Sequence, residues 1–207
     1  MGNDEPASGR QQGPLVVFVI GVAGCGKSTV AMALARQLKA VYLDKDTVAT
    51  HFTEKLLIQA GRSPSDRESD FYKQNVMPLE YLTLLDVGGQ NIRQRMPVVF
   101  DAPFGAYFND AEYVTRTARQ ADWPEVRAVV VHVTVDKERN RRQLLSRKLS
   151  RDAEKLSHWD EFWASQQRMH CLWSDVEHFT LENPDAAAVA QFGEGLLGHR
   201  RAGPSAA

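Results

Sequence analysis

Residues 21–28 of the chain read GVAGCGKS and match the pattern G-x-x-x-x-G-K-[ST] at every fixed position. The apolar run Leu15–Ile20 precedes this segment, and Val30, Leu34 and Leu38 follow it at the spacing of one helical face. A strand, a tight turn and a helix in this order gather backbone N–H groups and the positive end of a helix around one point. Phosphate binds at such a point, so this segment, called the phosphate loop below, predicts a nucleotide site in an α/β fold.

The residues of the phosphate loop have separate expected tasks. Its glycines let the backbone curl so that the N–H groups face phosphate oxygens. Lys27 would direct its charge at the β- and γ-phosphates, and the Ser28 hydroxyl would bind Mg²⁺. Cys25 lies at a variable position where a small residue fits, which is a simpler explanation than a redox role. The expected nucleotide-binding residues of this segment are Gly21, Gly24, Cys25, Gly26, Lys27, Ser28 and Thr29.

The bulk properties of the chain fit one soluble domain. Its 207 residues allow one substantial α/β domain, expected over residues 14–197, between a disordered arm at 1–13 and a disordered tail at 198–207. The formal net charge of −1 offers no general attraction to nucleic acid or to a membrane surface. No apolar run reaches the roughly 20 residues needed to span a bilayer, and the polar N-terminus does not resemble a signal peptide. The two cysteines make no disulfide framework, so we expect a cytoplasmic protein, monomeric or homodimeric.

Short apolar runs alternate with helical patterns along the rest of the chain. The runs are Leu15–Ile20, Ala40–Leu43, Pro97–Phe100, Arg127–Val135 and His178–Glu182. β-Branched residues dominate the first, third and fourth, as in strands that are buried on both faces. A second helix is expected from Thr47, with Val48, Phe52 and Leu56 on one face and Gly61 as its stop. The alternation predicts a parallel sheet with helices on both faces.

Three carboxylates follow apolar runs, where the active sites of open α/β sheets form. Asp101 directly follows one run and is the expected Mg²⁺ ligand, acting through the water shell of the ion, with a turn or N-cap role as the alternative. Asp44 and Asp46 would point to the same side of an extended segment. One of them could accept the proton of a hydroxyl that attacks a phosphate, although Asp46 could instead cap the helix that starts at Thr47.

These motifs give the chain a resemblance to the small P-loop kinases, a group that holds gluconate and shikimate kinases, chloramphenicol phosphotransferase, the polynucleotide 5′-kinase domain and similar AAA-type ATP-binding domains. The resemblance covers residues 15–182 and is carried by GVAGCGKS, YLDKD and VVFD. It implies a three-layer P-loop NTPase fold, with a five-stranded parallel sheet in the order 2-3-1-4-5 and an arginine-bearing lid. It also implies that Asp46, the second acid of the D-x-D pattern, orients or deprotonates the acceptor hydroxyl, with Asp44 beside it.

The resemblance places the lid after the fourth strand, in the segment 136–156. Arg147 and Arg151 are four residues apart and would share one face of a helix, from which they would stabilise charge on the transferring phosphate. Arg142 is a further candidate for holding nucleotide, and Asn183, after the last strand, is a candidate for contacting adenine. The alternative is a solvated helix with paired surface charges.

The expected activity is the ATP- and Mg²⁺-dependent transfer of a phosphoryl group to a hydroxyl of a small molecule, such as a sugar, nucleoside, amino acid or antibiotic. The acceptor is expected against the segment 47–95 and the loop after Asp101, with Arg67, Tyr72 and Phe104 as candidate contacts. Two alternatives stay open. One is a kinase of nucleic-acid 5′-hydroxyls or nucleotide sugars, of which the near-neutral charge disfavours the nucleic-acid kinase, and the other is a nucleotide-binding ATPase switch.

Overall fold

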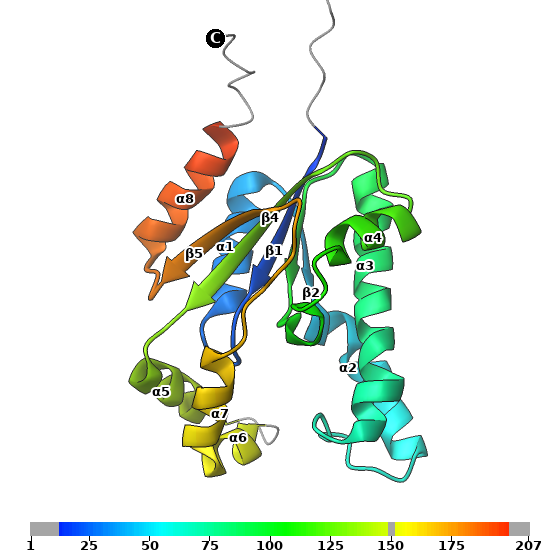
Figure 1. Ribbon diagram of the computed structural model, residues 1–207, viewed down its shortest axis with the longest axis vertical. Coiled ribbons are helices and arrows are strands. Elements are labelled where there is room, and N and C mark those ends of the chain that lie inside the picture. Colours follow the sequence, from blue (N-terminus) through cyan, green and yellow to red (C-terminus); the bar gives the residue numbers. More distant parts are fainter. Residues whose placement is uncertain (1–12, 149–151, 199–207) are drawn as a thin grey trace, which may run out of the picture.

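The computed structural model describes residues 13–148 and 152–198, which form a parallel sheet of five strands surrounded by helices. The strands are β1 (Leu15–Ile20), β2 (Val41–Asp44), β3 (Val98–Asp101), β4 (Arg127–Thr134) and β5 (Glu177–Glu182). Their order across the sheet is β2-β3-β1-β4-β5, and all neighbouring pairs are parallel (Figure 1). This is the P-loop NTPase fold, and the expected strand order is confirmed.

Helices connect the strands and cover both faces of the sheet (Figure 1). They are α1 (Lys27–Leu38), α2 (Lys45–Gln59), α3 (Met77–Arg93), α4 (Tyr113–Gln120), α5 (Lys137–Arg147), α6 (Ala153–Ser157), α7 (Trp159–Gln167) and α8 (Ala186–Gly198). A π-helix, η1 (Tyr72–Val76), leads into α3, and a 3-10 turn, η2 (Gly105–Tyr107), follows β3. Among the helices that the structure describes, none is both long enough and apolar enough to cross a membrane.

Strand β1 runs through the middle of the sheet, and its side chains alternate between two hydrophobic cores. Phe18 and its neighbours on the same face pack against α3, α4 and the residues after β3. Val17 and its neighbours on the other face pack against α1 and α8. Because all six residues of β1 are buried, the strand is hydrophobic without alternation, as its sequence indicates.

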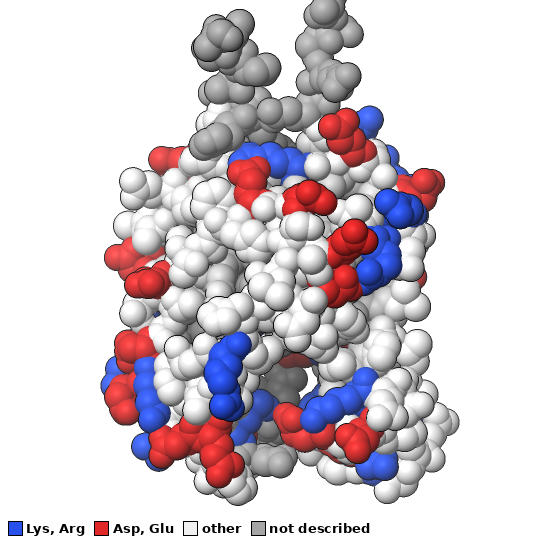
Figure 2. All heavy atoms as spheres, in the orientation of Figure 1, with Lys and Arg blue, Asp and Glu red and all other residues white. Residues whose placement is uncertain are grey.

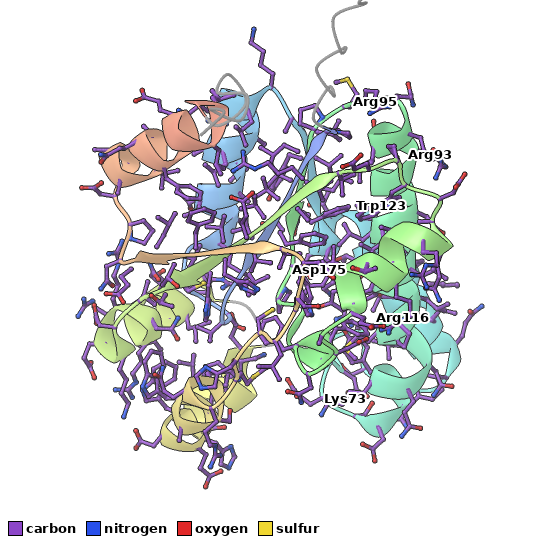
Figure 3. The ribbon with its side chains drawn as sticks, turned by 45° about the horizontal axis from the view of Figure 1, so that its top comes forward. Lys73, Arg93, Arg95, Arg116, Trp123 and Asp175 are labelled. Carbon is purple, nitrogen blue, oxygen red and sulfur yellow. The ribbon has the colours of Figure 1, made fainter. Side chains whose placement is uncertain are left out.

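Helix α3 is held against the sheet by close packing at its C-terminal half. Gly88 lies so near the ring of Phe100 in β3 that an added Cβ would collide with that ring. Trp123 follows α4 (Figure 3). Its ring stacks on that of Phe100 with the centroids 6.1 Å apart. Arg93 donates a hydrogen bond to the carbonyl of Ala121 and ties the end of α3 to the end of α4. These contacts fix the C-terminal half of α3, and the N-terminal half extends from this fixed part.

Helix α2 starts earlier than its sequence pattern predicts, and it buries a different face. It begins at Lys45 rather than Thr47, because the side chain of Asp44 caps it by accepting hydrogen bonds from the backbone of residues 46 and 47. Its buried residues are Lys45, Ala49, Thr53 and Leu57. Val48, Phe52 and Leu56, the expected inner face, are only half-buried, so the prediction of this face is wrong by one position.

The predicted lid segment, 136–156, is not one helix. Helix α5 ends at Arg147, and Lys148 has a left-handed backbone conformation with φ of 50°. Helix α5 therefore does not continue past Arg147. The prediction that Arg147 and Arg151 share one helical face involves Arg151, which lies outside the described residues, as do the predicted arm and tail apart from Gly13 and Gly198.

Candidate active site

A large cleft lies where the strands end, and residues of α5–α7 line one side of it and the N-terminal parts of α2 and α3 the other. Its volume is about 790 Å³. Figure 2 shows the molecule hollowed at its lower end, with basic and acidic side chains on both sides of the hollow. The predicted residues that line the cleft are Gly21, Gly24, Gly26, Lys27, Ser28, Thr29, Asp44, Asp46, Arg67, Tyr72, Asp101 and Arg147.

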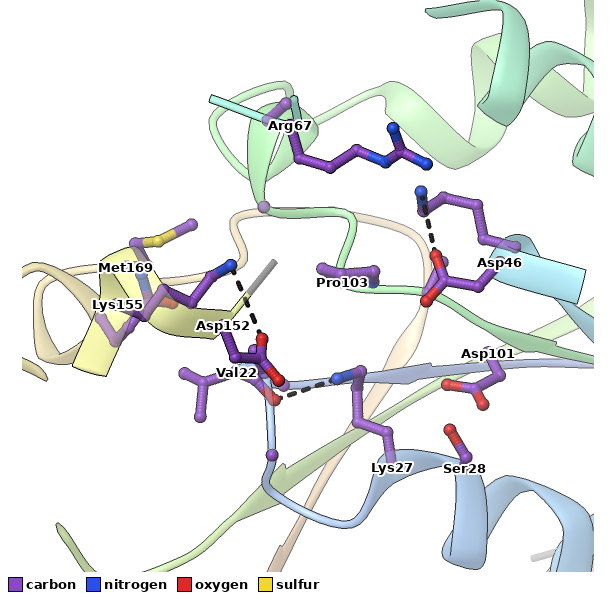
Figure 4. Close-up of a pocket in the computed structure, with 18 of the residues that line it drawn as sticks. Val22, Lys27, Ser28, Asp46, Arg67, Asp101, Pro103, Asp152, Lys155 and Met169 are labelled. Carbon is purple, nitrogen blue, oxygen red and sulfur yellow. Dashed lines mark hydrogen bonds and ion pairs between the residues drawn. The ribbon is translucent and has the colours of Figure 1, made fainter. Parts of the chain in front are cut away.

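The phosphate loop forms the floor of the cleft. Gly24 and Gly26 have φ of 79° and 91°, a left-handed conformation that side chains larger than hydrogen rarely adopt. The loop turns directly into α1, whose first residue is Lys27. The Lys27 ammonium donates a 3.0 Å hydrogen bond to the carbonyl of Val22, across the loop (Figure 4). The curled backbone, the start of a helix and one ammonium group thus meet at one point, which suits a polyphosphate.

Asp101 and Ser28 stand side by side next to this floor (Figure 4). Asp101 ends β3 and is 2% exposed, and it accepts a 2.9 Å hydrogen bond from the Tyr42 hydroxyl on the neighbouring strand. Burial raises the pKa of the Asp101 carboxyl, while its hydrogen bond with Ser28 and the charge of Lys27 oppose that rise. A hydroxyl and a carboxylate are the hard oxygen donors that Mg²⁺ prefers, so this pair fits a magnesium ion held partly by phosphate and water.

Asp44 and Asp46 both line the cleft, but their side chains are held differently. Asp44 is the last residue of β2 and accepts three hydrogen bonds, from the amides of Asp46 and Thr47 and from the Thr47 hydroxyl at 2.6 Å. Asp46 belongs to α2, and its carboxylate lies 3.4 Å from the Lys45 ammonium with 40% of the side chain exposed. The helical cap is therefore Asp44, and the expected extended alternation of the two acids is wrong because α2 starts between them.

A buried polar network lies behind this wall, and Tyr72 is its one member among the predicted residues. The carboxylate of Glu80, which is 1% exposed, accepts hydrogen bonds from three groups. They are the ammonium of Lys45 at 2.6 Å, the hydroxyl of Thr53 at 2.6 Å and the hydroxyl of Tyr72 at 2.8 Å. The network joins α2, η1 and α3, and two of its members, Lys45 and Tyr72, also line the cleft. The signal in the sequence was one charged residue on the buried face of α2 and one on that of α3.

The opposite wall of the cleft carries cations around a buried acid. Asp152 is 2% exposed, and its carboxylate lies 3.8 Å from both the Arg147 guanidinium and the Lys155 ammonium. Lys155 of α6 also lies 3.7 Å from Glu68, which belongs to the segment before η1 on the other side of the cleft. Arg147 and Lys155 are thus both held at the cleft, although only Arg147 was predicted.

Part of the cleft lining is apolar and consists of Pro103, Phe108, Met169 and Tyr81. Arg67 lies farther from Lys27 than Pro103 does (Figure 4), and its guanidinium is 5.3 Å from the centroid of the Tyr72 ring. This arrangement offers an apolar surface and a few polar groups, as pockets for small organic molecules do.

Four of the predicted site residues do not line the cleft. Phe104 is fully buried in the core, where its backbone N–H donates to the Tyr81 hydroxyl, so its ring cannot stack on an acceptor. Cys25 is buried against the core beside α1, which leaves only its backbone near the phosphate site. Arg142 is exposed on α5, and Asn183 anchors the start of α5 by accepting hydrogen bonds from Asp136 and Arg139.

His132 of β4 lines the cleft and was not predicted. Burial lowers the pKa of its imidazole, and the charges of His170, Lys27 and His178 add to that effect. No motif indicated it, because a single histidine within an apolar strand reads as a structural residue.

A family model described as an AAA domain matches residues 16–169, well over half of the chain. Among solved structures, a candidate kinase from Chloroflexus aurantiacus J-10-fl has a TM-score of 0.64 at 18% identity, with 91% of this chain and 98% of that one covered. A sugar kinase from Janibacter sp. HTCC2649 has a TM-score of 0.56 at 14% identity, with 90% and 95% covered. Shikimate kinase from Bacteroides thetaiotaomicron has 0.52 at 17% identity, with 89% and 98% covered. At these identities the likeness is one of fold. No curated protein matches the chain.

Proposed function

Because the chain belongs to the AAA domain family, we propose that it is an ATP- and Mg²⁺-dependent phosphotransferase that moves the γ-phosphoryl group to a hydroxyl of a small molecule. One observation carries the proposal. The phosphate loop and a carboxylate at the start of α2, that of Asp46, line the same cleft, so a triphosphate and an alcohol can meet there. The kinases among the proteins of similar fold are consistent with this reaction class.

The nucleotide would bind on the floor of the cleft. The N–H groups of the phosphate loop and the start of α1 would surround its phosphates, and the Lys27 ammonium would exchange the Val22 carbonyl for a phosphate oxygen. Ser28 and Asp101 would hold Mg²⁺, whose charge neutralises the phosphates when it is bound. Together these groups would hold the γ-phosphate at a constant position.

Asp46 is the acid that we assign to the acceptor hydroxyl. Three hydrogen bonds from the start of α2 occupy both oxygens of Asp44. The Asp44 side chain therefore acts as the cap of this helix. Asp46 would accept the proton of the hydroxyl as the hydroxyl oxygen forms its bond to the γ-phosphorus. The bond between that phosphorus and the bridging oxygen breaks in the same step, and ADP leaves with the bridging oxygen.

Arg147 and Lys155 would act on the transferring phosphoryl group from the opposite wall. Charge spreads over the equatorial oxygens in the transition state, and cations that are already in place stabilise it without reorganisation. Their present carboxylate partner, Asp152, keeps both cations near the cleft. The acceptor would lie between Asp46 and the apolar surface of Pro103, Phe108 and Met169.

Two measurements test this function. Calorimetry should show binding of ATP with Mg²⁺ to the wild type, and Lys27→Ala should lose most of it, while Lys55→Ala, at an exposed lysine of α2, should bind normally. A panel of sugars, amino acids, nucleosides and hydroxyl-bearing antibiotics should then contain a compound that gains phosphate from ATP. Binding without phosphorylation of any hydroxyl compound would contradict the transferase and favour a nucleotide-driven switch. Phosphorylation of an oligonucleotide 5′-end alone would replace the small-molecule acceptor.

A further inference from the structure

An asparagine of α5 reaches the phosphate loop from outside the cleft. Asn140 is fully buried, and its side-chain amide N–H donates a 2.9 Å hydrogen bond to the carbonyl of Ala23, 117 residues earlier in the chain. Leu144, one turn later on α5, packs on the next residue of the loop, Gly24. A Cβ added to Gly24 would lie 2.8 Å from the Leu144 side chain. Helix α5 therefore rests directly on the loop at the peptide between Ala23 and Gly24.

The hydrogen bond from Asn140 sets the direction of that peptide. In a trans peptide the C=O and the following N–H point to opposite sides, and no described peptide bond is cis. Since the Ala23 carbonyl is turned toward α5, the Gly24 N–H is turned away from it. Ala23 and Gly24 both line the cleft, whereas Asn140 does not. The orientation therefore points the N–H to the side where phosphate would bind, and it removes the carbonyl from that side.

Asn140 is a poor choice for stability alone. Its side-chain oxygen is buried and finds no hydrogen-bond partner among the described residues. A buried polar atom without a partner costs free energy, and a leucine of similar size would not incur this cost. Side chains that violate such a rule are most often found where function requires them.

The helix that carries Asn140 is anchored to the sheet. The Asp136 side chain caps α5 by accepting a 2.7 Å hydrogen bond from the Arg139 amide. The Asp136 amide in turn donates to the side-chain oxygen of Asn183 at 3.1 Å, and the Arg139 guanidinium donates to the Asn183 carbonyl at 3.2 Å. Asn183 directly follows β5, so the start of α5 is fixed to the sheet and Asn140 acts from a fixed base.

We infer that Asn140 is a positioning residue for the nucleotide, which acts through the Ala23–Gly24 peptide rather than by touching phosphate. The inference rests on the proposed function only in its first half, the binding of a nucleoside triphosphate to the phosphate loop. Neither the acceptor nor the transfer step enters it. Asn140 acts on the same phosphate loop as Lys27. Its unpartnered oxygen lowers the stability of the fold, and its N–H holds the loop in the conformation that binds phosphate.

The test is to replace Asn140 and to measure affinity and stability separately. In Asn140→Leu the dissociation constant for ATP with Mg²⁺, measured by calorimetry, should rise about tenfold or more, because the N–H of Gly24 is no longer held in place. The midpoint of thermal unfolding without nucleotide should change little, since removal of the unpartnered oxygen offsets the lost hydrogen bond to Ala23. A residue that only supports the fold would move stability down and leave affinity unchanged. Asn140→Ala provides a second variant if leucine prevents folding.

Leu145→Ala is the matched control, because Leu145 lies on the same helix with 53% of its surface exposed. It should change neither quantity. Affinity within twofold of the wild type in both Asn140 variants would overturn the inference and leave the proposed function intact. A wild type that binds ATP tightly but phosphorylates nothing would overturn the proposed transfer and leave the role of Asn140 intact. A wild type without affinity for any nucleoside triphosphate would overturn both.

Discussion

The Tyr42 hydroxyl donates a 2.9 Å hydrogen bond to the Asp101 carboxylate across two neighbouring strands. Strands β2 and β3 are in register, with Tyr42 opposite Val99 and Asp44 opposite Asp101. The register places one carboxylate at the end of each strand, and the tyrosine holds the buried one in position. The position of Asp101, the expected magnesium ligand, is thus set by strand pairing and by the tyrosine.

Asp101→Asn should make the protein more stable and less active. Burial raises the pKa of Asp101, so the folded state holds its proton more tightly than the unfolded state, and stability falls as pH rises between the two pKa values. Asparagine lacks this ionisation, so the urea midpoint of the variant should exceed that of the wild type at pH 7. The difference should vanish below the pKa of the unfolded state. Loss of the ligand should lower Mg²⁺-dependent turnover about 10- to 100-fold. A less stable variant at pH 7 would contradict this account.

Tyr42→Phe should move the pH dependence of nucleotide binding. Burial is the main cause of the raised pKa of Asp101, and the hydrogen bonds from Ser28 and Tyr42 oppose it. Without the tyrosine hydroxyl the pKa of Asp101 should rise further. As the pH is lowered, binding of ATP with Mg²⁺ should therefore begin to weaken at a higher pH than in the wild type. Calorimetry over a series of pH values measures the pH at which binding is lost. Tyr113→Phe, at a buried tyrosine outside the cleft, should leave the profile where it is.

Asp44 and Asp46 should respond differently to the same substitutions. Asp46→Asn should bind ATP normally and slow transfer by roughly 10²-fold or more, the usual effect of losing a general base. Asp44→Asn should be close to neutral, because asparagine is also a good N-cap, whereas Asp44→Ala should cost about 1 kcal/mol of stability. Single-turnover rates and urea unfolding separate the two roles. If Asp44→Asn abolishes transfer and Asp46→Asn does not, the assignments are reversed.

Glu80→Ala should be among the most destabilising single substitutions in the cleft wall. It would leave the buried Lys45 ammonium without its 2.6 Å partner, and removing one member of such a pair typically costs about 3–5 kcal/mol. Urea unfolding should show most of that loss recovered in the double variant Lys45→Met, Glu80→Leu, where no buried charge remains. Glu54→Ala, on α2 but outside the network, is the control. A loss below about 1 kcal/mol in Glu80→Ala would show that Lys45 finds other partners.

Arg147 and Arg142 form a matched pair on one helix. Arg147 lines the cleft and Arg142 does not, although both have exposed side chains. Arg147→Ala should lower turnover at least about tenfold while changing ATP affinity little, because its charge acts on the transferring phosphoryl group. Arg142→Ala should leave both quantities within about twofold, as expected for an exposed charge. Equal effects of the two substitutions would reduce Arg147 to a surface charge.

The parts of the molecule that local patterns determine were predictable from the sequence. Strand β1 is buried on both faces and therefore apolar throughout, and the phosphate loop needs glycine at fixed positions, so both are visible in the sequence. Contacts between distant segments were not predictable. Nothing near Lys45 indicates that its partner is Glu80, 35 residues away. The burial of Phe104 depends on a left-handed turn with φ of 55° that directs its ring into the core.

The face of α2 shows why half-buried helices are hard to read. Lys45 and Thr53 are polar residues on its buried face, where each donates to Glu80, while apolar Val48 and Phe52 are only half-buried. A pattern of apolar residues selects the wrong stripe when the true inner face holds a polar network.

The contact between Gly88 and Phe100 lies in the core, but it sets the position of α3, which lines the cleft. The Phe100 ring is stacked between Phe18 and Trp123, so it cannot yield, and any side chain at position 88 must push α3 away from the sheet. Met77 and Tyr81 lie on the same helix and line the cleft, so the displacement reaches them. A substitution deep in the interior can therefore alter the shape of the cleft without any change in the residues that line it.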